Sequence, residues 1–333
     1  MALLATTHPT LSDVAKRLDP KGRVDTIVEM LTQTNEALDD IVFVEGNLPT
    51  GHRSTIRTGL PGVTWRKLYG GVQPTKSTTA QVTDSCGMLE AYAEIDKALA
   101  DLNGNTAAFR MTEDRAFLEA MNQQMATTLI YGNEGTQPEA FTGLAPRFNA
   151  KSGAVNGENV ILGDGVGTDN TSIWLVCWGP NTVHGIYPKG STAGFYMEDK
   201  GQVTVENIDG SNGRMEAYRT HYRWDLGLVV RDWRYVVRIA NIDKSALTKN
   251  AASGSDLIDL MAQACELIPS AGMGNMAFYG SRLIRSFLRR QITNKVAAST
   301  LTMEEVSGRK VVAFDGIPFR RLDALAADEA LVS

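Results

Sequence analysis

Apolar positions recur at helical spacing in several parts of the chain. The clearest case is 111–133, where Thr112 stands at the place of a helix N-cap. Glu113 and Asp114 follow in the first turn, where acidic side chains complement the helix dipole. The apolar stripe consists of Phe117, Leu118, Met121, Met125, Leu129 and Ile130. Helical patterns also predict helices over 10–40, 88–101, 255–268 and 276–292.

Between 171 and 243 the pattern changes to strand-like runs that are rich in β-branched and aromatic residues. Near the C-terminus, two further runs flank Asp315–Gly316, which predicts a hairpin-like pair of strands. The order is helices, a β block, more helices and final strands. It predicts an α+β chain whose β block is inserted between two parts of one helical domain.

The segment 45–84 is polar and rich in Gly, Pro, Thr and Ser. Loops of this length are usually functional or disordered, and the threonine-rich alternation together with Trp65 favours an ordered, extended β-hairpin arm. Strand-like pieces occur at Thr55–Thr58, Val63–Tyr69 and Thr78–Thr83. No acidic residue lies between Glu45 and Asp84, and the basic residues there are Arg53, Arg57, Arg66, Lys67 and Lys76. Such an arm has few apolar anchors of its own and needs a surface to lie on.

One predicted strand, "DWRYVVRIANID" at 232–243, combines an apolar pattern with several charges. Its valines and isoleucines indicate a buried strand. Because burying a charge is costly unless the charge is paired, we expect ion pairs within the domain or across an interface. The expected pairs are Asp232 with Arg231 or Arg234, and Arg238 with Asp243.

Bulk properties limit the classes of function. The 333 residues are 43% hydrophobic and 21% charged, with a net charge of −5 and a pI of about 5.5. The chain as a whole is therefore not a strong ligand for nucleic acid or for an acidic membrane. The length suggests about two domains, and neither a signal peptide nor a membrane span is predicted. Three cysteines without CxxC spacing, Cys86, Cys177 and Cys265, predict reduced thiols in an intracellular protein.

Motifs for catalysis or cofactor binding are weak. The glycine-rich stretch 161–170 lacks the lysine and the following helix that a phosphate loop needs. The four histidines do not cluster at metal-ligand spacing, and the carboxylates of the β block are scattered. Three arginines of 281–291, Arg282, Arg285 and Arg289, share a helix face and favour contacts with acidic protein neighbours over nucleic acid. No catalytic, cofactor or metal site is predicted, and the pattern indicates an assembly protein.

Four stretches resemble one family closely: "TLIYGNEGTQPEAFTGLAPRFN", "TSIWLVCWGPNTVHGIYPKGS", "YRTHYRWDLGLVVRDWRYVVRIANID" and "DLIDLMAQACELIP". They are similar to major capsid (head) proteins of tailed bacteriophages, of the Bordetella phage and epsilon-fifteen type. The resemblance runs from about residue 10 to the C-terminus and implies the Hong Kong 97-type shell fold. The implied parts are an N-terminal arm at 1–44, an extended hairpin arm (E-loop) at 45–88, a peripheral domain at 89–150 and 293–333 with a spine helix at 112–131, and an axial domain at 151–292.

The resemblance implies a structural, non-catalytic protein that assembles with itself as hexamers and pentamers into an icosahedral head around double-stranded DNA. Expected partners are a separate scaffolding protein, a portal, a cement or decoration protein, and DNA contacted non-specifically on the inner surface. A separate scaffold is expected because the arm begins almost at Met1. No cofactor and no membrane are expected. We expect a non-covalent shell, located in the virion and assembled in the host cytoplasm.

In this family the hairpin arm lies across a neighbouring subunit, which explains a basic ribbon without a core. The expected contact residues of the arm are Arg53, Arg57, Trp65, Arg66, Lys67 and Lys76. Their expected acidic partners lie on a neighbour's spine helix and are Glu113, Asp114 and Glu119. Two alternatives stay open: a cellular nanocompartment shell of the same fold, and an oligomeric carbohydrate-active enzyme with two carboxylates in one cleft.

Overall fold

The computed structural model describes residues 32–102, 105–206, 213–247, 255–293, 301–306 and 309–333. Most of the helix expected at 10–40 lies outside these residues, and α2 (Ala37–Asp40) is its described helical part. The chain forms two compact units. Met88–Met125 and Gly194–Asp225 belong to the first unit, and Thr34–Gly87, Ala126–Ala193 and Leu226–Ser333 belong to the second. Within the described residues, no helix has the length and apolar character needed to cross a membrane.

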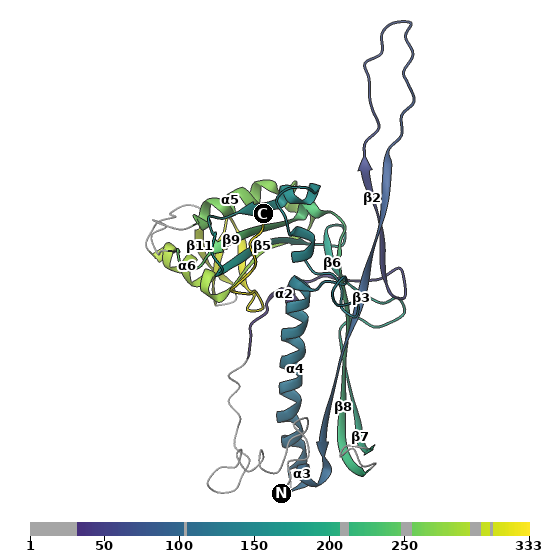
Figure 1. Cartoon of the computed structure of the whole chain (residues 1–333), viewed down its shortest axis with the longest axis vertical. Helices are drawn as coiled ribbons and strands as arrows, with labels where there is room; N and C mark the ends of the chain where they lie inside the picture. Colours follow the sequence, from purple (N-terminus) through teal and green to yellow (C-terminus); the bar gives the residue numbers. More distant parts are fainter. Residues whose placement is uncertain (1–31, 103–104, 207–212, 248–254, 294–300, 307–308) are drawn as a thin grey trace. The chain divides into compact units, whose positions relative to one another are not determined.

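The first unit packs strands against one face of a long helix, α4 (Thr106–Tyr131) (Figure 1). β7 (Phe195–Glu206) pairs antiparallel with β8 (Arg214–Val230), which is next to β3 (Thr78–Asp96) in the sheet order. Between these strands and the helix, Ala93, Met121 and Tyr222 are buried, with Leu89, Ala91, Phe117 and Trp224 packed around them. The short helix α3 (Lys97–Asp101) follows β3 directly.

The helix expected over 88–101 is wrong for most of its length, because the chain continues as strand β3 up to Asp96. Met88 and Tyr92 are exposed, and the apolar side chains on the covered face of this stretch are Leu89, Ala91, Ala93 and Ile95. They recur at every second position, which is the period of a strand. Alanine and glutamate favour a helix by propensity, but packing of one strand face decides the conformation here.

The long helix is confirmed, but it begins before the expected cap. α4 starts at Thr106, and the side-chain oxygen of Asn105 accepts a hydrogen bond from the Ala108 amide at 3.3 Å. Thr112 lies inside the helix, where its hydroxyl donates to the Ala108 carbonyl at 2.9 Å, as interior threonines do. Of the predicted apolar stripe, Leu118 is exposed.

The second unit is built around β5 (Asn170–Trp178), which is buried along its whole length. It pairs antiparallel with β9 (Val236–Asp243) and with β10 (Asn275–Gly280). β9 also pairs in parallel with the short strand β4 (Val160–Leu162). A strand with a partner along each edge and a covered surface reads as a continuous apolar run, and "IWLVCW" in β5 is such a run.

The last strands of the chain extend this sheet. β10 pairs in parallel with β13 (Ile317–Arg321), β13 pairs antiparallel with β12 (Arg309–Phe314), and β12 with β11 (Leu301–Val306). The expected turn at Asp315–Gly316 is confirmed, because both residues have positive φ, 50° and 74°, as a type I′ turn requires.

Other strands of the second unit lie beyond β5. β6 (Val183–Tyr187) pairs in parallel with β1 (Phe43–Glu45) and antiparallel with the end of β8. The described part of this unit also contains four short 3-10 helices: η1 (Ala145–Phe148), η2 (Val155–Asn159), η3 (Trp233–Tyr235) and η4 (Ala271–Met273).

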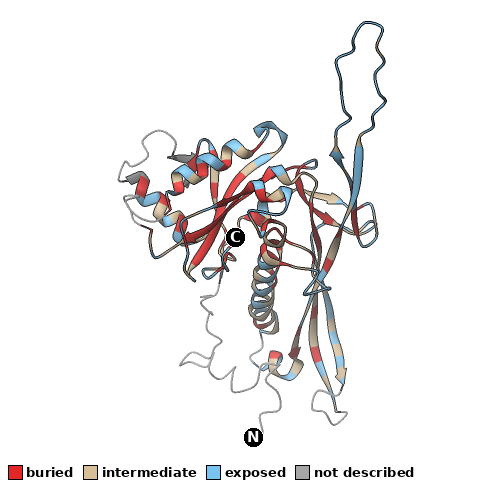
Figure 2. Ribbon diagram, turned by 45° about the horizontal axis from the view of Figure 1, so that its top comes forward, coloured by how far each residue is buried: buried red, intermediate tan, exposed pale blue. Residues whose placement is uncertain are grey.

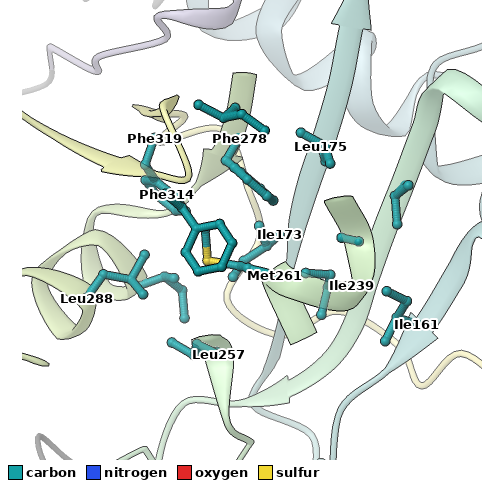
Figure 3. Packing of buried hydrophobic residues seen from close by; sticks show 14 of the residues in the cluster. Ile161, Ile173, Leu175, Ile239, Leu257, Met261, Phe278, Leu288, Phe314 and Phe319 are labelled. Carbon is teal, nitrogen blue, oxygen red and sulfur yellow. The ribbon is translucent and has the colours of Figure 1, made fainter. Parts of the chain in front are cut away.

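The main core of the second unit lies where α5 (Leu257–Leu267) and α6 (Arg282–Thr293) pack against the sheet (Figure 3). Strands and helices both contribute, including Ile173, Leu175, Val237, Ile239, Leu257, Met261, Phe278, Ile284, Leu288, Phe314 and Phe319. The helix expected over 276–292 is wrong at its start, because β10 ends at Gly280 and α6 begins at Arg282. A short apolar run is ambiguous between strand and helix, and pairing with β5 and β13 decides it.

Candidate assembly surfaces

The hairpin arm is formed by β2 (Gly51–Gly59) and the first part of β3. The two strands pair antiparallel from Gly51↔Ser85 to Gly59↔Thr78, with an irregularity between Arg57 and Gly59. Residues 60–77 join them as a long loop (Figure 1), so the strand piece expected at Val63–Tyr69 is wrong. Proline, which cannot donate to a strand ladder, occurs on both sides of this loop, at Pro61 and Pro74.

The loop is exposed along most of its length (Figure 2), and its exposed residues include a series of large apolar ones. Trp65 is fully exposed at 101%, and Val63 is exposed at 90%. The other members are Leu60, Leu68, Tyr69 and Val72. Single exposed apolar residues are ordinary, but a contiguous exposed group is typical of a surface that another molecule covers.

The basic residues expected at the interface, Arg53, Arg57, Arg66, Lys67 and Lys76, are all exposed on this arm. The Arg53 guanidinium donates to the Thr83 hydroxyl across the hairpin at 3.3 Å. Arg57 lines a cavity of about 700 Å³ together with Arg231, Asp232, Trp233 and Arg234. Positive charges and apolar side chains are therefore interleaved, and a matching surface needs both apolar and acidic groups.

The root of the arm is held by Arg147, which the sequence analysis did not single out. Its guanidinium pairs with Asp84 of β3 at 2.8 Å and donates to the carbonyls of Thr142 and Leu228 at 3.1 and 3.2 Å. The Asp84 side chain is only 5% exposed. Arginine presents several donors in a rigid fork, so one side chain fastens three segments of the second unit.

The acidic residues expected on the spine helix have surroundings within their own chain. The Glu119 carboxylate accepts hydrogen bonds from the backbone amide of Gln33 at 2.8 Å and from the side chain of Gln123 at 2.7 Å. Burial raises the pKa of Asp114, against the neighbouring Tyr222 and Arg110, which lower it. Glu113 is partly buried on the same helix. Their contact with the arm of another copy stays a prediction.

Asp232 and Arg234 lie against each other within the chain. Asp232 caps η3 by accepting a hydrogen bond from the Arg234 amide, and the two side chains pair at 2.7 Å. Burial raises the pKa of Asp232, but the hydrogen bonds from Arg234 outweigh it and hold this pKa below its usual range. The Arg234 side chain is 54% exposed, so the pair contributes at most about 1 kcal/mol.

Arg238 does not pair with Asp243, contrary to expectation. It pairs with Glu329 at 2.9 Å, and each of the two side chains is 5% exposed. Asp243 instead accepts hydrogen bonds from the amide and hydroxyl of Ser245. Five residues of strand span roughly 16 Å, which exceeds the reach of a side-chain pair on the same strand.

Glu329 closes a buried polar network that sequence reasoning missed. Its carboxylate accepts hydrogen bonds from the hydroxyls of Tyr131 and Ser172 as well as from Arg238. Arg238 donates in addition to the Phe148 carbonyl at 2.9 Å. The stretch "AADEALV" reads as an exposed acidic tail, and no local signal shows that one of its carboxylates is buried.

The carbohydrate-active alternative requires two carboxylates in one cleft. A cavity of about 760 Å³ beside α5 is lined by Glu158 and Glu266 together with Lys151, Gln263 and apolar residues. Both glutamates are exposed, whereas a glycosidase separates its acid from its nucleophile by placing them in different environments. Among the described residues, no group of three or more side chains is arranged to hold a metal ion.

A family model described as major capsid protein GP7 matches residues 19–333. The chain belongs to this family. The capsid protein is 41% identical to a chain in the structure of bacteriophage Epsilon15, covers 100% of its own length and 99% of that chain, and superposes with a TM-score of 0.78. A search of curated proteins found no match.

Two more distant structures carry no weight in the assignment. The capsid of bacteriophage JBD30 is 8% identical, with 89% of this chain and 92% of that chain covered and a TM-score of 0.48. The SrpI encapsulin complex of Synechococcus elongatus is 11% identical, with 71% and 97% covered and a TM-score of 0.41. The α+β, Hong Kong 97-type fold and the role as a major capsid protein of a tailed phage are confirmed, and neither alternative is favoured.

Proposed function

We propose that this capsid protein builds its shell as hexamers and pentamers, and that the hairpin arm holds them together by lying across a neighbouring copy. The observation that carries the proposal is the exposed apolar group on the loop 60–77. Covering one large apolar side chain contributes roughly 1.5–3 kcal/mol. The loop has Trp65 and Tyr69 almost fully exposed at 101% and 99%, so a neighbour gains more by covering it than by covering an ordinary polar loop.

The two compact units support an assignment of domains that differs from the expected boundaries. We assign the peripheral domain to Met88–Met125 and Gly194–Asp225, because β7 and β8 pack with the spine helix. We assign the axial domain to Ala126–Ala193 and Leu226–Ser333, whose described part includes the core around β5. The final strands then belong with the axial sheet and not with the spine helix.

The acidic partner of the arm is proposed to lie on a neighbour's spine helix, at Glu113, Asp114 and Glu119. Glu119 accepts two hydrogen bonds within its own chain, so a contact with the arm of a neighbour has to compete with them. The charge swap Arg66→Glu with Glu119→Arg tests this pairing. We expect each single variant to impair assembly and the double variant to restore it in part, since Glu119→Arg also breaks bonds within its own chain. Equal impairment of all three variants contradicts the pairing.

The remaining partners follow from membership in a phage capsid family. We propose that the shell is non-covalent, encloses double-stranded DNA through non-specific contacts, and forms in the host cytoplasm with a separate scaffold, a portal and a decoration protein. A net charge of −5 supports weak contact with DNA over tight binding. In denaturing gels of assembled shells, this chain is then expected to run at monomer mass, without bands of cross-linked multimers.

The arm proposal has a direct test with a matched control. Val63 on the arm and Val166 on a loop outside the arm are exposed at 90% and 86%. We expect Val63→Ser combined with Trp65→Ser to leave the helix signal in circular dichroism unchanged and to abolish shells in light scattering and negative-stain microscopy. Val166→Ser should assemble normally. Normal shells from the arm variant refute the proposal.

A further inference from the structure

Two buried histidines meet at the root of the hairpin arm, within the second unit. His52 is the second residue of β2, and His184 is the second residue of β6. The two residues are 9% and 1% exposed. Their rings stand edge to face, with centroids 5.9 Å apart and an interplanar angle of 86°. The contact between the arm root and β6 therefore includes a pair of imidazoles.

Within the described residues, the ring nitrogens of the two histidines lack hydrogen-bond partners. Both ring nitrogens of His52 and both of His184 are buried without a hydrogen-bond partner in the described part of the chain. A buried polar group left without a partner costs about 1–3 kcal/mol, whereas apolar side chains of similar volume carry no such cost. Two unsatisfied titratable side chains in contact call for an explanation other than packing.

The charges around the pair oppose protonation. Burial lowers the pKa of His52, and Arg231 lowers it further. Asp84 raises this pKa, but its effect is the smallest of the three. Burial lowers the pKa of His184 to about 4, and Arg231 and His52 contribute in the same direction. The backbone of Gly179, whose contact with the ring falls outside good hydrogen-bond geometry, has the smallest effect and raises this pKa. Asp84 is a weak counter-ion for an imidazolium because its carboxylate is already paired with Arg147 at 2.8 Å.

We propose that His52 and His184 form an acid-sensitive joint of the arm. As neutral rings they pack the arm root against β6. When they are protonated, they repel each other and Arg231, and the root of β2 separates from β6. The inference concerns the attachment of the arm to its own chain, and it holds whether or not the arm lies across another copy.

The direction of the pH dependence follows from linkage. A histidine whose pKa is lowered in the folded state binds its proton more readily when the joint is open, so the joint is intact above the ordinary value of 6.5 and weakens as the pH falls toward 4. If His184 regains its ordinary pKa on opening, the opening equilibrium constant rises about 30-fold between pH 7.5 and pH 5. His52 adds to this effect.

Hydrogen exchange of the full-length, unassembled chain tests the joint. With rates corrected for the intrinsic pH dependence, amides of β2 and β6 should lose protection about 30-fold at pH 5, while those of β10 keep it. The double variant His52→Gln with His184→Gln has no proton to bind and should lose the pH dependence. The control His221→Gln changes a histidine of the first unit that contacts Glu90 and should keep it.

Two results overturn the joint. The first is an equal loss of protection at pH 5 in the wild type and in the double variant. The second comes from NMR titration of the wild-type imidazole protons, which also serves if the double variant does not fold. Titration of both His52 and His184 near 6.5 refutes the joint, and titration well below that value, in step with the exchange of β2, supports it.

Discussion

Replacing Glu329 with alanine is expected to destabilise the second unit strongly. Glu329 pairs with Arg238 at 2.9 Å, and both side chains are 5% exposed. Truncation leaves the guanidinium buried over the Trp174 ring, with the Ser172 hydroxyl and the Phe148 carbonyl as its remaining partners. A full positive charge then stays in the core without a carboxylate.

The magnitude follows from the burial of the pair. Removing one partner of a buried ion pair costs about 3–5 kcal/mol. The carboxylate also accepts hydrogen bonds from Tyr131 and Ser172, and each such bond contributes about 1 kcal/mol. The remaining partners of Arg238 offset part of the loss, so we expect about 4 kcal/mol in total, a factor of roughly 1,000 in the unfolding equilibrium.

Urea unfolding of the unassembled chain, followed by tryptophan fluorescence, measures this change. Arg234→Ala is the matched control, because it breaks an exposed pair of the same unit and should cost less than about 1 kcal/mol. The double variant Arg238→Met with Glu329→Leu removes both charges and should recover most of the loss. The reasoning is refuted if Glu329→Ala unfolds within about 1 kcal/mol of the wild type, or if the double variant is less stable than the single one.

Three further changes test other contacts. Arg147→Ala leaves Asp84 buried without its counter-ion, so limited proteolysis should cut at the arm root faster than in the wild type; an unchanged cleavage rate contradicts the clamp. Asp256→Ala removes the N-cap of α5 and should cost about 1 kcal/mol in urea unfolding. Tyr279→Phe removes a hydroxyl that donates to Asp40 and accepts from a tryptophan indole, both at 2.7 Å, and should cost about 1–3 kcal/mol. A loss below about 0.5 kcal/mol in either unfolding experiment refutes that assignment.

Local patterns made part of the fold predictable. The spine helix was found because its apolar positions repeat over several turns, and the turn at Asp315–Gly316 because few residue pairs adopt positive φ twice in succession. β3 was misread at 88–96 because its alternating apolar residues are mostly alanine and leucine, which also favour helices. β10 was misread because a short apolar run carries no period until its neighbouring strands are known.

The residues of the candidate assembly surfaces were likewise predictable only in part. The basic residues of the arm and Trp65 could be identified from the sequence, because the polar and basic composition of an exposed segment is visible in a short stretch of residues. The partners of buried charges could not be identified in this way, because the fold brings together residues that are far apart in the sequence. Arg147 meets Asp84 across 63 positions, and Arg238 meets Glu329 across 91 positions. The nearer aspartate, Asp243, was the natural expectation from sequence and was wrong.

The long-range pairings around β5 also set the order in which the chain folds. β5 pairs with β9 and β10, and β10 pairs with β13. The hydrogen bond between Ser172 and Glu329 joins residues 157 positions apart. Sheets made of such distant segments close in milliseconds to seconds, whereas isolated hairpins and helices form in microseconds. We therefore expect the arm and the spine helix to begin forming while the sheet around β5 is still open. During this interval, a higher concentration of chains makes it more frequent that a chain meets the exposed arm of another chain before its own sheet is complete. We therefore expect the concentration to determine which fraction of chains enters a shell and which fraction aggregates.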